Sequence, residues 1–164
     1  MRFFLSIFLT PIYVAATTFH YEIIPIKELL TIGNSRAIVP FPPIIEVLIL
    51  EFFIELLREA GARLPTKIGQ TIGIVGGIVI GTAAVQAGIT SNFLIILVAI
   101  SALASFTIPN YLMSTAIRII RFPMIILGGL LGLIGIMFGT CFFAHPFIKN
   151  KIFRKTIFNT YLSL

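Results

Sequence analysis

Residues 68–88 read IGQTIGIVGGIVIGTAAVQAG, an uncharged run in which glycine recurs at every fourth position. The run is long enough to cross the hydrocarbon core of a bilayer, which takes about 20 predominantly apolar residues in a helix. Glycines spaced four apart lie on one helical face and let a second backbone approach closely. The stretch therefore predicts a membrane helix that packs against a neighbouring helix through Gly69, Gly73, Gly77 and Gly81.

The whole chain has the composition of a membrane protein. Of its 164 residues, 58% are hydrophobic and only 11% are charged, and the mean hydropathy is +1.08. Soluble domains carry about 25% charged residues. Three further apolar runs, at residues 3–19, 93–109 and 123–144, approach or reach the length of a membrane helix. We therefore expect an all-α integral membrane protein, with a membrane domain over residues 1–146 built as a helical bundle of about four to five membrane helices.

The first apolar run, residues 3–19, allows two interpretations. It follows one basic residue and contains Val14-Ala15-Ala16, a small-residue pattern typical of signal-peptide cleavage sites. The other interpretation, which we favour, is a genuine membrane helix that is interrupted by Pro11 and whose upstream part is missing from this chain.

A basic C-terminal tail, residues 147–164, follows the last apolar run. Lys149, Lys151, Arg154 and Lys155 supply four of the six net positive charges of the chain. Basic residues beside a membrane helix mark a cytoplasmic face or contact with anionic lipid. The tail therefore predicts contact with membrane lipid and gives no indication of nucleic-acid binding.

Residues 43–60 predict an amphipathic helix, opened by Pro43 and ended by Gly61. At 100° per residue its charged side chains fall on one face, whereas Glu46 lies off that face. The charged face consists of Glu51, Glu55, Arg58 and Glu59.

This charged face has three interpretations. Carboxylates at membrane depth face water or a partner, and rings of glutamates attract cations, so the face is a candidate lining for a pore or vestibule, with Arg58 paired to Glu55. The helix could instead be interfacial or re-entrant with a wet charged face, which leaves four spans rather than five. The third interpretation is contact with a partner subunit.

The second half of the chain holds the remaining polar features. Ser101 and Ser105 lie four apart before a break expected at Pro109 and Asn110, and a last span is expected to begin at Pro123. Arg118 and Arg121 lie three apart on one helical face, where we expect them to anchor the helix at the membrane interface rather than to dock a cytosolic domain. Glycines at 128, 132, 135 and 139 predict a left-handed helix crossing.

Catalytic and metal sites are not indicated. The chain has one cysteine, two histidines and no aspartate, and it lacks a nucleophile–base set or a phosphate-binding loop. We therefore expect no enzyme activity, no metal and no cofactor.

Several ordered strings resemble the A subunits of GerA-type spore germination receptors. The most specific are residues 39–42 (VPFP), 55–65 (ELLREAGARLP), 68–77 (IGQTIGIVGG), 80–88 (IGTAAVQAG) and 104–111 (ASFTIPNY). Residues 11–20 (PIYVAATTFH) also resemble the first membrane helix of that family, which favours an uncleaved helix at the N-terminus.

The resemblance implies a multi-pass subunit of a nutrient receptor in the spore inner membrane, acting in ion movement. It implies a homo-oligomer and B- and C-type partner subunits. Members of the family carry a cytosolic domain before the first membrane helix and a longer C-terminal segment, so the chain matches their membrane core. Three alternatives stay open, namely a secondary transporter, a structural scaffold and a non-functional truncated remnant.

Overall fold

The computed structural model describes residues 2–63, 66–106 and 111–149, and the surroundings of the side chains over residues 4–63, 76–105 and 115–143. Within these ranges every element of regular secondary structure is a helix. The elements are α1 (Arg2–Thr18), the short 3-10 helix η1 (Tyr21–Ile23), α2 (Ile26–Arg36), α3 (Pro43–Arg63), α4 (Thr66–Gln86), α5 (Asn92–Phe106) and α6 (Tyr111–Lys149). Pro109 and Asn110, and most of the basic tail, lie outside the described residues.

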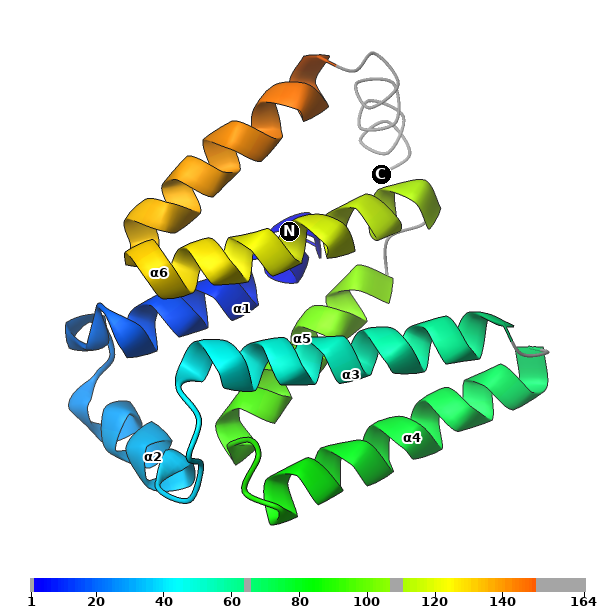
Figure 1. Cartoon of the computed structure of the whole chain (residues 1–164), viewed down its shortest axis with the longest axis horizontal. Helices are drawn as coiled ribbons and strands as arrows, with labels where there is room; N and C mark the ends of the chain where they lie inside the picture. The colour runs from blue at the N-terminus through cyan, green and yellow to red at the C-terminus, as the bar shows by residue number, and fades with distance from the viewer. Residues whose placement is uncertain (1, 64–65, 107–110, 150–164) are drawn as a thin grey trace.

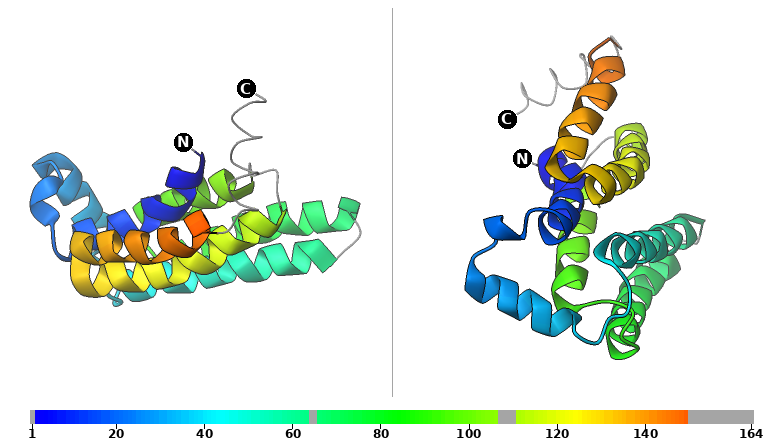
Figure 2. Two further views of the ribbon diagram at one scale, coloured as in Figure 1. Left: turned by 90° about the horizontal axis from the view of Figure 1, so that it is seen from above. Right: turned by 60° about the vertical axis from the view of Figure 1, so that its left-hand side comes forward.

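The helices form one bundle around α1, α3, α5 and α6 (Figure 1). The most extensive packing joins α1 to α6, and α5 crosses against α1. α3 and α4 run side by side as a hairpin on one flank of the bundle in both views (Figures 1 and 2), and α4 packs mainly against α3. The site described below lies where α1, α3, α5 and α6 meet.

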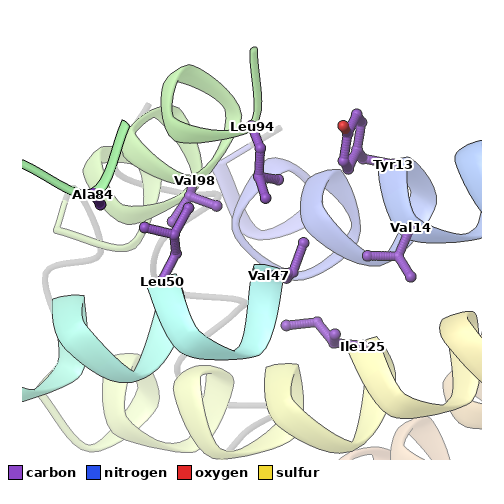
Figure 3. Close-up of a cluster of buried hydrophobic side chains, with 8 residues drawn as sticks. All are labelled: Tyr13, Val14, Val47, Leu50, Ala84, Leu94, Val98 and Ile125. Atoms are coloured by element: carbon purple, nitrogen blue, oxygen red, sulfur yellow. The ribbon is translucent and has the colours of Figure 1, made fainter. Parts of the chain in front are cut away.

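The apolar core lies where five helices converge (Figure 3). Val14 of α1, Val47 of α3, Leu94 and Val98 of α5 and Ile125 of α6 are completely buried there. Burial of these branched side chains against one another fixes the distances between the helices.

The structure shows where the two helices of the α3–α4 hairpin end. α3 begins at Pro43, but it continues past Gly61 to Arg63, so the expected end at Gly61 is wrong. A glycine inside a helix costs only about 1 kcal/mol, and the Glu59–Arg63 pair supports the last turn. α4 ends where Gly88 adopts φ 68°, a conformation that suits glycine.

α6 breaks at a different residue from the one expected. It continues through Pro123 and breaks at Gly132, which has φ 65° and ψ −144°. Proline removes one hydrogen bond but keeps a helical φ, whereas positive φ values cannot continue a right-handed helix. The expected single span at 123–144 is therefore divided, and α6 folds back into two limbs, residues 111–131 and 133–149 (Figure 1).

The glycines of α6 face different neighbours. A Cβ atom on Gly128 would lie 3.0 Å from the carbonyl oxygen of Pro11 on α1, whereas Gly135 and Gly139 lie inside the hairpin of α6. A Cβ atom on Gly139 would lie 2.5 Å from the Sδ of Met124, on the opposite limb. Within the described residues one helical segment, Thr115–Phe143, is long and apolar enough to cross a membrane by length and composition, and it contains the break.

Candidate functional site: a buried charge cluster between α3 and α6

Two ion pairs join α3 to α6 inside the bundle. The Nη1 of Arg121 lies 2.8 Å from the Oε2 of Glu51, and these side chains are only 3% and 5% exposed. One turn away, Arg118 binds the carboxylate of Glu55 and donates a second hydrogen bond of 2.8 Å to the Oγ1 of Thr115. Two of the three carboxylates of the predicted charged face, Glu51 and Glu55, therefore contact arginines far away in the sequence.

The spacing of the four residues matches two antiparallel helices. Glu51 and Glu55 lie four apart on α3, and Arg121 and Arg118 lie three apart on α6, so each places its charges on a single face. Because α3 and α6 run antiparallel, Glu51 can reach Arg121 while Glu55 reaches Arg118, so both pairs form together. Each charge also removes the cost of burying its partner unpaired.

A shell of hydroxyl groups surrounds the inner pair. Ser6 and Thr10, one turn apart on α1, and Ser101 of α5 are completely buried. The Oγ1 of Thr10 donates to Glu51 Oε1 at 3.2 Å, and Arg121 Nη2 donates to the Oγ of Ser6 at 2.8 Å. Arg121 also donates to the Oγ and the carbonyl oxygen of Ser101, at 3.3 and 3.2 Å. The inner pair, formed between α3 and α6, is therefore bound by two further helices, α1 and α5.

The other two charges of the predicted face have further partners. Arg58 donates from Nη2 to the Oγ of Ser105 at 2.7 Å, and Glu55 forms an ion pair with Arg118, so each has a partner outside α3. The local pairing of Arg58 with Glu55 stays a prediction. Glu59 forms an i,i+4 pair with Arg63 at 2.6 Å, with both side chains largely exposed. Surface pairs of this kind contribute little to stability.

The cluster as a whole is not acidic. It brings the carboxylates of Glu51 and Glu55 together with the guanidinium groups of Arg58, Arg118 and Arg121, so two negative charges face three positive ones. The helical wheel of α3 alone predicts a net-negative stripe. The two arginines of α6 cancel that negative excess.

The arginines of α6 lie deeper than expected. Arg121 is buried and paired, and the side chain of Arg118 is 12% exposed. Anchoring at a membrane interface requires a side chain that reaches the headgroups, so that interpretation is wrong for Arg121. The sequence does contain a signal for this pairing. Charges of opposite sign within apolar helices, such as the glutamates of α3 and the arginines of α6, are expected to pair inside the bundle, whatever their separation along the chain.

Glu46, which lies off the charged face, is the most enclosed carboxylate of the described chain. Its side chain is completely buried, and its Oε1 accepts hydrogen bonds from the Oγ1 of Thr90 at 3.1 Å and the backbone N–H of Ser91 at 2.6 Å. The Nε of Arg36 lies 3.4 Å from its Oε2. The helical wheel leaves Glu46 without a partner because its neighbours come from α2 and from the turn before α5.

The glycine face of α4 is only partly visible. The surroundings of Gly69 and Gly73 lie outside the described residues, Gly77 has nothing within 4 Å of a Cβ position, and a Cβ on Gly81 would lie 3.0 Å from Ile95 Cδ1. Within the chain, the close approach to α3 is made by Gly76, whose Cβ would lie 2.6 Å from Leu57 Cδ2. Helix packing through the face of Gly69, Gly73, Gly77 and Gly81 therefore stays a prediction.

Comparison with known proteins identifies the family. The sequence profile of the family described as Bacillus/Clostridium GerA spore germination protein matches residues 1–163. The chain belongs to the GerA family of spore germination proteins. The resemblance drawn from residues 39–111 is confirmed.

Individual relatives agree with this assignment. The chain is 56% identical to spore germination protein GerQA of Bacillus cereus over 93% of its own length, and 60% identical to GerIA of the same organism over 87%. It is 47% identical to the membrane protein YfkQ of Bacillus subtilis over 93% of its length. It spans only 31%, 22% and 30% of these relatives, and no solved structure matches. The buried cluster therefore lies in a segment that corresponds to less than a third of the length of these relatives.

Proposed function

We propose that this chain is the membrane part of an A-type subunit of a nutrient receptor in the spore inner membrane, and that it contributes to a nutrient-gated ion path. The observation that carries the proposal is the inverted distribution of its side chains. The charged residues Glu46, Glu51 and Arg121 are buried, whereas large apolar side chains face outward. Such a distribution suits a lipid environment and not water.

The outward apolar surface supports membrane insertion in particular. Leu130, Ile134, Met137, Phe138 and Phe142 of α6 are each at least 60% exposed. Contiguous exposed patches of this kind are rare on soluble monomers. At 1.5 Å per residue α3, α4 and the first limb of α6 are each about 31 Å long, which matches a hydrocarbon core of about 30 Å. These lengths support a multi-pass arrangement.

Membrane residence has a direct test. We expect the protein to stay in the membrane pellet through extraction at alkaline carbonate, because lipid-facing helices of this length are not released with peripheral proteins. The measurement is an immunoblot of pellet and supernatant, with a peripheral protein as the control for release. Recovery in the supernatant would contradict the proposal.

The charge cluster supports an ion path that is closed in this conformation. Ionisable groups inside membrane helices commonly mark ion routes, and a line of carboxylates raises the local concentration of cations. Here Arg118 and Arg121 neutralise the carboxylates of α3. Separation of α3 from α6, driven by nutrient binding elsewhere in a complex with B- and C-type subunits and further copies of the chain, would expose Glu51 and Glu55.

Cation release from spores tests this path. We expect Glu55→Gln, introduced into an intact receptor, to slow nutrient-triggered cation release by about tenfold, because removal of the charge lowers the local cation concentration. Glu55→Lys is expected to slow it further by reversing the field. The measurement is the release of cations after nutrient addition, with subunit levels followed by immunoblot.

The matched control for this experiment is Glu59→Gln. Glu59 lies on the same helix, and its side chain is 57% exposed and paired locally with Arg63. We expect little change from it. Glu46 is unsuitable as a control, although it lies off the charged face, because its carboxylate is buried and bonded. Equal release from the Glu55 variants and the control, at normal subunit levels, would favour a structural role for the cluster.

A further inference from the structure

The Arg121 guanidinium is bound only through its two terminal nitrogens. Nη1 lies 2.8 and 3.1 Å from the two oxygens of Glu51 and 3.3 Å from the Oγ of Ser101. Nη2 lies 2.8 Å from Ser6 Oγ and 3.2 Å from the carbonyl oxygen of Ser101. The buried Nε finds no hydrogen-bond partner among the described residues. The surroundings therefore bind the tip of the side chain as a compact positive charge, without the two-pronged geometry that distinguishes arginine.

The atoms around this charge are all oxygens, and they come from three helices other than α6. Glu51 of α3, Ser6 of α1 and Ser101 of α5 supply five of them, and each of these residues is at most 4% exposed. Thr10, also completely buried, donates to Glu51 and fixes its carboxylate. The hydroxyl of Ser101 donates to the carbonyl of Val98 at 2.8 Å, so its lone pairs face the charge. The oxygen cage is therefore built without Arg121, which enters it from α6.

The formal charge of the cage indicates which ion it suits. Hydroxyl, carbonyl and carboxylate oxygens are the donors that replace the hydration shell of hard cations. The cage holds one carboxylate, and the described part of the chain contains no group of three or more His, Cys, Asp or Glu side chains able to hold a metal. A single negative charge balances a monovalent cation, whereas Ca²⁺ sites use several carboxylates.

We propose that the cage of Glu51, Ser6 and Ser101 is a monovalent-cation site, and that Arg121 occupies it as a tethered cation in the closed conformation. When the Arg121 side chain withdraws, the five oxygens stay in place, because they belong to α1, α3 and α5 and not to α6. A sodium or potassium ion then occupies the space that Nη1 and Nη2 leave between these oxygens. The assignment of a role in ion movement rests on the proposed function, whereas the existence of the site does not.

The test removes the tethered cation from the full 164-residue chain. In Arg121→Ala, purified in detergent micelles, we expect the midpoint of thermal unfolding to rise saturably by about 5 °C when potassium or sodium chloride replaces choline chloride at constant ionic strength. The wild-type protein is expected not to respond, because Arg121 fills the site. The double variant Glu51→Gln/Arg121→Ala is expected not to respond either, because the cage has lost its charge. The measurement is circular dichroism at the helix band, and Arg121→Gln serves as a second variant.

Each result decides the matter. Equal midpoints for Arg121→Ala in all three salts would overturn the proposal, and so would an equal shift in the double variant, since cations would then act elsewhere. Failure of both Arg121 variants to fold in potassium also counts against it, because the ion should replace the lost charge. The melt uses neither nutrient nor ion flux. If the salt raises the melting midpoint of Arg121→Ala, but the Glu55 variants release cations from spores as the control does, the proposed function is rejected and the cation site is retained.

Discussion

Glu51→Gln is expected to lower the free energy of unfolding by about 3–5 kcal/mol, the range found when one member of a buried ion pair is removed. The substitution keeps the volume of the side chain but leaves the Arg121 guanidinium, 3% exposed, without a counter-charge. The hydroxyl groups of Ser6 and Ser101 remain as acceptors but carry no charge. The measurement is the midpoint of thermal unfolding in micelles, followed by circular dichroism under one heating rate.

Two further variants separate loss of the pair from loss of a single charge. Glu51→Gln/Arg121→Gln replaces both charges with amides and is expected to recover a large part of the loss, because no buried charge then lacks a partner. Glu59→Gln, on the same helix, removes a carboxylate from a pair exposed to 57% and 78%, and is expected to cost less than about 1 kcal/mol. If Glu51→Gln is no more harmful than Glu59→Gln, the inner pair contributes no more than a surface pair.

Gly132→Ala is the second substitution with a large expected effect. Gly132 has φ 65° and ψ −144°, a region open to glycine and strained for every L side chain. Forcing another residue into such a conformation costs about 1–3 kcal/mol. The new Cβ would also lie 3.0 Å from the Cε1 of His20 and 3.2 Å from the Cβ of Phe19. We expect the thermal midpoint to fall by several degrees, because the two limbs of α6 can no longer fold back without strain.

A matched glycine substitution checks that this effect belongs to the turn. Gly33 lies within helical α2, and a Cβ at this position would have nothing within 4 Å. Gly33→Ala is therefore expected to be neutral or to stabilise the protein by up to about 1 kcal/mol, since alanine is the better helix former. An equal fall for both variants would indicate that Gly132 is not under special conformational demand.

The family and the helical class were predictable from the sequence, because both depend on local patterns. The string at residues 55–65 and the spaced glycines after it identify the GerA family without reference to a fold. The start of α3 at Pro43 depends on the fixed φ of proline and its missing donor, which are properties of the residue itself. Signals of this kind are carried by a few adjacent residues.

The charge cluster was only half predictable. A helical wheel correctly gathers Glu51 and Glu55 on one face of α3, because a wheel compares residues of a single helix. It cannot supply Arg121, which lies 70 residues further along the chain, or Ser6, which lies on α1. Glu46 illustrates the same limit, since its neighbours Arg36, Thr90 and Ser91 come from outside α3.

The sequence by itself determined that the chain is helical, apolar and a GerA-family protein, since composition, periodicity and ordered strings are read along one dimension. Only the tertiary structure decided that the acidic face of α3 is neutralised by arginines and that α6 turns at Gly132 and not at Pro123. Both outcomes have one physical reason. A buried charge takes the partner that helix packing brings within reach, and a glycine becomes a turn only where the surrounding helices accommodate the reversed chain.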